Sequence, residues 1–144
     1  MSEENRLFLS SLFQSIADQG WGENFMAALH DDLEFNAMGT SPVAGCYRGK
    51  ENYRNQLLKR LDDKLASWPV PIVDTMMVDG DLACLQFHAT GGKGKNGADF
   101  NMHYCWVLRL EHQKIIKIWG YYDSFKMNAL FNEKQSPVSR ALSA

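Results

Sequence analysis

The stretch LEFNAMGTSPVAGCYRGKENY, residues 33–53, contains a change from an extended to a helical pattern. Leu33, Phe35 and Ala37 alternate with polar residues, as in a strand with one buried face. Glycines and a proline follow, and a helical pattern begins at Lys50. A strand that leads through such a loop into a helix can form the rim of a pocket, and residues 35–48 are the candidate rim. The same glycines can instead serve only to reverse the chain.

The composition indicates one compact domain. The chain has 144 residues, of which 45% are hydrophobic, and this suits a single unit with its own core. We expect one domain over residues 1–144, with its core at about 5–131 and a loosely held tail at 132–144. The formal net charge of -2 gives no electrostatic reason to expect nucleic acid or an anionic membrane as a partner.

The N-terminal segment and the cysteines bear on the compartment. The first residues are acidic where a secretory signal would be basic, and no run of apolar residues approaches the roughly 18 needed for a membrane span. Cys46, Cys84 and Cys105 form no CxxC pair, and any disulfide scheme leaves one of them over. We therefore expect a cytoplasmic protein without a membrane segment and without a cofactor.

Hydrophobic periodicity predicts helices first and strands second. Helical spacing covers residues 7–19, 21–29 and 50–65, and a short terminal helix is expected near residues 126–133. Alternating patterns at 69–78, 82–90, 98–110 and 114–125 predict a four-stranded antiparallel meander, with residues 33–38 as an extra strand. The GGKGKNG segment at 91–97 is expected to be a hairpin loop. This order predicts an α+β fold in which the helices cover one face of a curved, mainly antiparallel sheet.

Two motifs carry a resemblance to a known family. SPVAGCYRGKE at the entry to the third helix and IIKIWGYYDS on the last strand resemble the nuclear transport factor 2-like superfamily, in particular its SnoaL-like branch of polyketide cyclase-like and ketosteroid isomerase-like proteins. The likeness covers about residues 5–131. It implies a cone-shaped roll that binds a small hydrophobic, oxygen-bearing molecule, with or without cyclase- or isomerase-like acid-base activity. A non-enzymatic carrier or sensor, or an interaction module with a filled pocket, are the alternatives.

The catalytic residues of the related isomerases and epoxide hydrolases are absent at the matching positions. The resemblance places the isomerase base at Ala37 or, with a slip of one residue, at Asn36. It places the tyrosine at Phe13 and the protonated acid at Trp106, so none of the three groups is present. The final-strand aspartate of the epoxide hydrolases falls on Gly120, and residues 82–90 contain neither Arg nor Asp.

The same family register assigns faces to the strand residues. It points Gln86 and His88 into the cone and leaves Leu85 and Phe87, with Val107 and Trp119, for an outer face. His88 is the candidate catalytic acid or base, because an unperturbed imidazole titrates near neutrality; it can equally be a hydrogen-bonded sheet histidine. A structure with His88 on the outer face would overturn its proposed role. The expected ligand-binding residues are Phe13, Phe35, Asn36, Ala37, Gln86, His88, Tyr104, Trp106 and Tyr122.

Three further expectations concern metals, Asp123 and assembly. His103 and Cys105 lie two residues apart on one strand, but no third ligand is placed by the sequence, so we expect no metal site. Asp123 has the parity of the outer face, and is expected at an interface or as the cap of the terminal helix. Aromatic residues on both faces of the sheet predict a homodimer through the outer face.

Overall fold

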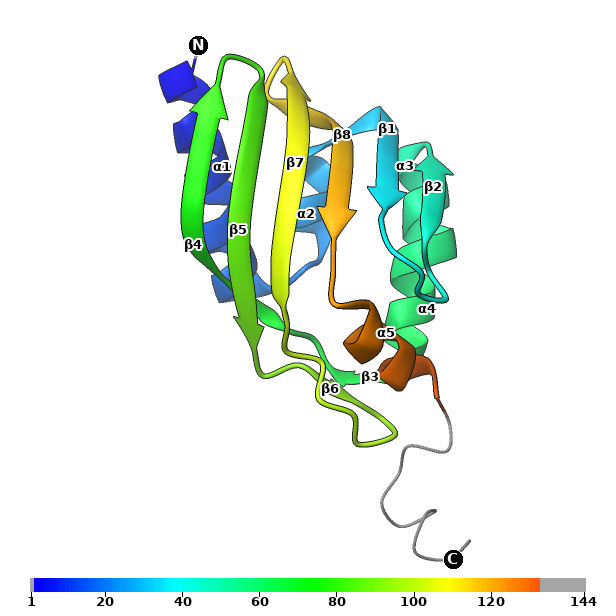
Figure 1. The fold of residues 1–144 in the computed structure, drawn as a ribbon. Coiled ribbons are helices and arrows are strands. Elements are labelled where there is room, and N and C mark those ends of the chain that lie inside the picture. Colours follow the sequence, from blue (N-terminus) through cyan, green and yellow to red (C-terminus); the bar gives the residue numbers. More distant parts are fainter. Residues whose placement is uncertain (1, 133–144) are drawn as a thin grey trace, which may run out of the picture.

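The computed structural model describes residues 2–132, and the expected tail lies outside them from residue 133 onward. An N-terminal helical pair precedes the sheet, and a second helical run follows its first hairpin (Figure 1). The helices are α1 (Ser2–Gln19), α2 (Glu23–Ala27), α3 (Lys50–Asn52), the π-helix η1 (Tyr53–Leu58), α4 (Lys59–Lys64) and α5 (Ser124–Phe131). None of the helices in this part of the chain is long and apolar enough to cross a bilayer.

Six strands form the main sheet, in the order β2-β1-β8-β7-β5-β4. The last four are the expected antiparallel meander, while β1 pairs parallel with β8 and antiparallel with β2. A separate two-stranded sheet joins β3 to β6. The strands are β1 (Leu29–Ala37), β2 (Gly45–Arg48), β3 (Leu65–Ser67), β4 (Val70–Asp79), β5 (Leu82–Thr90), β6 (Lys93–Gly94), β7 (His103–Glu111) and β8 (Lys114–Tyr121).

The α+β class with N-terminal helices on a curved, mainly antiparallel sheet is confirmed. In detail, β1 begins at Leu29, four residues before the expected start, and the expected rim loop contains β2. The third helix is one run from Lys50 to Lys64, but its middle is a π-helix. The GGKGKNG segment contributes β6, which pairs with β3 in place of serving only as a loop.

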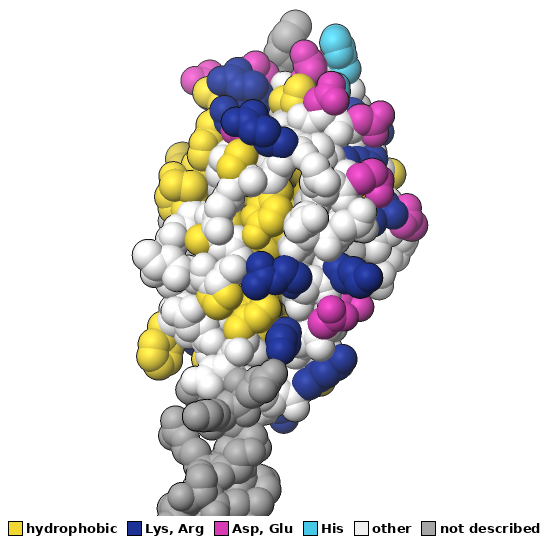
Figure 2. Space-filling model, turned by 90° about the vertical axis from the view of Figure 1, so that its right-hand side faces the viewer, with side chains coloured by type: hydrophobic (Ala, Val, Ile, Leu, Met, Phe, Trp, Pro, Cys, Tyr) yellow, Lys and Arg dark blue, Asp and Glu magenta, His cyan; other side chains and the backbone are white. Residues whose placement is uncertain are grey.

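The helices cover one face of the sheet and leave the other face uncovered. In Figure 1 the helices α1 to α4 lie behind the sheet, and the face toward the viewer is open. Figure 2 views the molecule from the β2 edge, and hydrophobic side chains gather along its left side, which is the side of the open face. We call this open face of the sheet the outer face.

The expected orientation of β5 is wrong, because its apolar set faces the helices. Leu85 and Phe87 are at most 1% exposed, whereas Gln86 is exposed and His88 is half-buried on the outer face. Leu85 pairs with Trp106 on β7, and directly paired residues lie on the same face of a sheet. An inward Trp106 therefore requires an inward Leu85. A shift of β5 by one residue would turn its apolar side chains to the outer face and its polar side chains into the core.

Replacing Leu85 and Gln86 separately tests this orientation. Leu85→Ala is expected to lower the free energy of unfolding by about 2–5 kcal/mol, because it leaves a cavity in a closed core. Gln86→Ala is expected to change it by no more than about 0.5 kcal/mol, since the side chain is exposed. Urea denaturation followed by circular dichroism measures both, and a larger loss for Gln86→Ala would contradict the orientation seen here.

Candidate functional site

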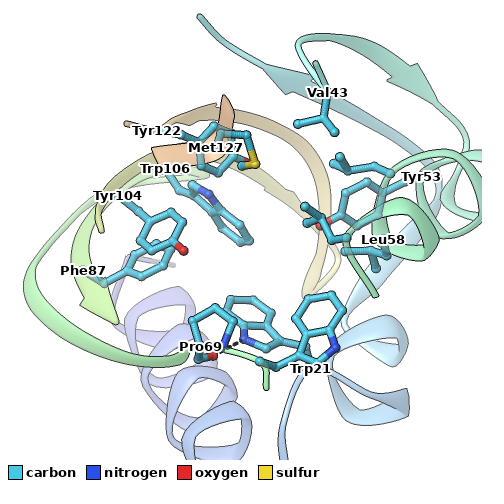
Figure 3. A pocket seen from close by; sticks show the side chains of 13 residues that line it. Trp21, Val43, Tyr53, Leu58, Pro69, Phe87, Tyr104, Trp106, Tyr122 and Met127 are labelled. Atoms are coloured by element: carbon cyan, nitrogen blue, oxygen red, sulfur yellow. Dashed lines mark hydrogen bonds between the residues drawn. The ribbon is translucent and has the colours of Figure 1, made fainter. Parts of the chain in front are cut away.

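A small cavity lies inside the cone, between the sheet and the helices. Its volume is about 50 Å³. At about 10–15 Å³ for each water-sized group, it holds about four such groups. In Figure 3 Phe87 and Tyr104 lie on one side and Tyr53 and Leu58 on the other, with Trp21 and Pro69 facing Trp106 across the space. Aromatic residues make up most of the wall: Trp21, Tyr53, Trp68, Phe87, Tyr104, Trp106 and Tyr122.

Trp106 fills the centre of the cone. It extends from β7 and is only 4% exposed. Its ring lies 5.4 Å from that of Phe87 and 5.8 Å from that of Phe35, both edge to face. Phe13, Trp21 and Phe25 also contact it, with ring centroids within 6.1 Å. The interior is therefore largely occupied by its own aromatic side chains, and the cavity is the space that they leave.

Tyrosine hydroxyls supply the polar groups of the cavity. Within the described part of the chain, neither Tyr53 nor Tyr104 has a hydrogen-bond partner for its hydroxyl. Burial raises the pKa of both well above the usual tyrosine value. Both therefore remain neutral O–H groups at physiological pH, able to donate a hydrogen bond to a ligand oxygen.

Gly120 makes room for a further polar group, the Tyr122 hydroxyl, next to the indole nitrogen of Trp106. A Cβ atom at this position would lie 2.6 Å from the Tyr122 hydroxyl oxygen and 3.2 Å from the indole nitrogen of Trp106. The hydroxyl and the indole N–H therefore lie together over the glycine. Burial raises the pKa of Tyr122 well above its usual value, and the neighbouring Trp106 opposes that shift only in part. The indole N–H is buried, and no acceptor among the described residues meets hydrogen-bonding geometry with it.

His88 lies on the outer face, away from the cavity. Its Nδ1 atom is 2.8 Å from Oδ2 of Asp74, the β4 residue left without a strand partner at the register shift between Val73 and Thr75. The alternative of a hydrogen-bonded sheet histidine is what the structure shows, and the expectation that His88 and Gln86 point into the cone is wrong. The physical reason is the apolar alternation of β5, whose inward set is Ala83, Leu85, Phe87 and Ala89.

The residues expected from β1 and α1 divide between the two faces. Asn36 lies on the outer face, where its side-chain amide donates to Glu34 and to the carbonyl of Ile118. That hydrogen bond, together with the ammonium of Lys117, lowers the pKa of Glu34. Ala37 and two of the expected aromatic residues, Phe13 and Phe35, are buried in the core beside the cavity. The expected rim contributes Val43 to the cavity wall.

Asp123 is a helix cap. Its carboxylate accepts hydrogen bonds from the backbone N–H groups of Phe125 and Lys126 and so begins α5. His103 and Cys105 lie on the outer face of β7, where the sulfur of Cys105 is 3.7 Å from that of Cys84. No group of three or more potential metal ligands occurs in residues 2–132.

Several cavity residues were not foreseen from the sequence. Trp21, Leu57, Leu58 and Leu61 come from segments with helical spacing, and Trp68 lies in the link between β3 and β4. Helical spacing indicates a buried face, but nothing in it shows which core positions border an empty space. Met127 enters the wall from α5, and only the long-range packing of that helix brings it there.

Comparison with known proteins agrees with this architecture. The model of the SnoaL-like domain matches residues 11–118, so the chain belongs to the SnoaL-like domain family. A search of curated protein sequences returns no match. The resemblance stated from the sequence is thereby confirmed at the level of family and fold.

Several solved structures share the fold at low sequence identity. An NTF2-like protein of unknown function from Burkholderia pseudomallei K96243 has a TM-score of 0.73 at 14% identity, over 88% of this chain and 95% of that one. An NTF2-like protein from Burkholderia xenovorans LB400 has a TM-score of 0.69 at 22% identity, over 92% and 98%. A protein with a ketosteroid isomerase-like fold from Catenulispora acidiphila DSM 44928, solved in complex with trimethylamine, has a TM-score of 0.64 at 14% identity, over 79% and 84%.

Gly120→Ala tests the packing of the polar pair. The new methyl group would collide with the Tyr122 hydroxyl, so we expect a loss of about 1–3 kcal/mol in the free energy of unfolding. The matched control is Gly120→Ala combined with Tyr122→Phe, in which the nearest colliding atom is gone and the glycine substitution should cost less. Urea denaturation of the four variants of this cycle measures the coupling, and strictly additive losses would contradict the contact.

Proposed function

We propose that this SnoaL-like domain is a carrier or sensor that holds a small apolar molecule with one or two oxygen atoms in its aromatic cavity. The observation that carries the proposal is the set of neutral hydroxyls, chiefly that of Tyr104, beside a small apolar space and without a protein partner among the described residues. A ligand carbonyl or ether oxygen would accept the hydrogen bonds that are left unmade.

The chemistry of the wall favours holding a ligand over acid-base catalysis. The wall residues described here include no carboxylate and no imidazole. Buried hydroxyls with raised pKa values donate hydrogen bonds readily but do not accept a proton near neutral pH. His88, the earlier candidate for proton transfer, is bonded to Asp74 on the other face of the sheet. We therefore assign no catalytic residue.

The size of the cavity limits the size of the ligand. A space for about four water-sized groups admits a short ketone or ether, or one end of a longer molecule, but not a fused-ring compound unless side chains move. The structural relative from Catenulispora acidiphila was solved with trimethylamine, a molecule of comparable size. That complex supports the proposal of a small ligand. The polar group of the ligand is inferred from the tyrosine hydroxyls of this chain, which would donate to an oxygen atom.

Titration with a short ketone tests the proposal. We expect acetone, a ketone of four non-hydrogen atoms, to bind the wild-type chain, and Tyr104→Phe to weaken binding by about three- to tenfold through the loss of one hydrogen bond. His88→Ala should leave the affinity unchanged, and xenon binding should survive Tyr104→Phe because xenon needs only an apolar space. Chemical-shift titration by nuclear magnetic resonance measures all three. No binding of ketone or xenon, or a loss with His88→Ala equal to that with Tyr104→Phe, would contradict the proposal.

We further propose that two copies assemble through their outer faces. The centre of this face carries half-buried Val107 and Trp119 and, beside them, Tyr121 at 45% exposure. Several charged residues on the face are already paired within the chain, as in Arg109 with Asp81 and Arg48 with Glu34. Two identical faces can therefore meet with little charge repulsion, and a two-fold contact would cover the apolar strip.

Val107→Arg tests the assembly. The wild-type chain is expected to be a dimer at micromolar concentration, and an arginine at the centre of the face should produce a monomer, because it buries two unpaired charges per dimer. Leu7→Glu, a change at a side chain 60% exposed on α1, is the control and should remain dimeric. Light scattering coupled to size-exclusion chromatography measures the mass; a monomeric wild type would rule the dimer out.

A further inference from the structure

A second hollow lies against the cavity on the helical side of the molecule. This open groove has a volume of about 570 Å³ and runs between α2 and the helix that contains η1. It shares three wall residues with the cavity, namely Trp21, Leu58 and Trp68. The cavity and the groove thus adjoin at these three residues.

Two of these three side chains are fixed by hydrogen bonds and one is not. The indole N–H of Trp21 donates to the carbonyl of Pro69 at 2.8 Å, and that of Trp68 donates to Asp62 at 2.8 Å. Leu58 is half-buried and is held by apolar contacts alone. Rotation of Leu58 between the two fixed indoles is therefore the easiest way to join the two spaces.

The turn at Tyr53–Leu58 is a π-helix that borders both spaces. The backbone N–H of Lys59 bonds to the carbonyl of Arg54, five residues earlier, where an α-helix would use the residue four earlier. Arg54, Leu58 and Lys59 line the groove, and Tyr53, Leu57 and Leu58 line the cavity. One helical turn thus serves both spaces, and π-turns occur frequently at functional sites.

Hydrogen-bond donors in the groove are left unused. Arg54 has only long ion-pair contacts, at 3.6 Å to Glu23 and 3.9 Å to Glu51, and its Nε atom has no acceptor among residues 2–132. The side-chain ammonium of Lys59 forms no ion pair or hydrogen bond within the same residues. The acidic side chain of Asp62 is occupied by the Trp68 N–H. The groove therefore offers unused hydrogen-bond donors to a negatively charged acceptor.

We propose that the cavity and the groove together bind an amphiphilic monocarboxylate. Its short apolar end passes Leu58 into the aromatic cavity, and its carboxylate remains in the groove, where Arg54 and Lys59 donate hydrogen bonds to it. Arginine suits this role because its guanidinium can hold a carboxylate with two parallel hydrogen bonds. This inference rests on the proposed function of the cavity and adds the class of head group.

The long contacts of Arg54 make it feasible for a ligand carboxylate to replace Glu23 as its partner. Glu23 is 87% exposed at its side chain, and an exposed ion pair at 3.6 Å contributes little to stability. A ligand carboxylate held partly out of water by the Trp21 and Trp68 rings would bond more strongly than Glu23 does. Glu23 can then turn into solvent without leaving a buried charge.

Hexanoate and 1-hexanol form a matched pair of probes. At one ionic strength, we expect hexanoate to bind wild-type chain about tenfold more tightly than 1-hexanol, with both shifting the indole N–H signals of the cavity tryptophans. Arg54→Gln should weaken hexanoate about tenfold and leave 1-hexanol unchanged. Arg48→Gln removes the same charge from the outer face and should change neither affinity. Lys59→Gln should give a smaller loss for hexanoate alone.

The outcomes separate this inference from the proposed function. Equal affinities for the two probes, with no effect of Arg54→Gln, would overturn the carboxylate inference and leave cavity binding in place. A loss of hexanoate binding with Arg54→Gln but no shift at the Trp106 indole would show a surface ion contact, and would overturn the joint site. No indole shift with either probe would overturn the proposed function as well. The folded state of each variant is read from the same nuclear magnetic resonance spectra.

Discussion

The packing of one indole, that of Trp106, sets what this cone can contain. Five aromatic rings surround it at centroid distances of 5.4–6.1 Å. Aromatic pairs in such tilted arrangements contribute about 0.5–1.5 kcal/mol each beyond the area they bury, so the cluster is a major source of stability. The same ring occupies space that a ligand would otherwise use. A polar acid at this position, as in the related isomerases, would leave the cone wider and would require a bonding partner.

Local patterns predicted the elements well, and analogy to the family misled where it opposed them. The alternation of Ala83, Leu85 and Phe87 with polar residues indicates the buried face of β5 by itself. The family register opposes this pattern, and it places His88 and Gln86 inside. The same register was right for Tyr104 and Trp106, which agree with the apolar pattern of β7. In an antiparallel pair, a residue that points inward on one strand requires its direct partner to point inward as well. The sequence already contains this constraint.

Other parts of the site depend on information that no local pattern holds. β2 is four residues long and exposed, and its pairing with β1 follows from the turn before it. The π-turn at Tyr53–Leu58 lies within an ordinary helical stripe of leucines, so periodicity alone cannot separate it from an α-helix. The cavity is the small remainder of a packed interior, and its position depends on the side-chain directions of helices and strands far apart in sequence.

The helix that contains the π-turn connects the interior to the surface. Tyr53 and Leu57 line the cavity, Lys59 lines the groove, and Leu58 between them borders both spaces. Because the groove residues Arg54 and Lys59 retain spare donors while Trp21 and Trp68 are fixed, the soft element of this boundary is Leu58. Rotation of one leucine side chain costs far less than moving a strand or helix. Rotation of Leu58 is therefore the smallest movement by which a ligand in the groove could reach the cavity.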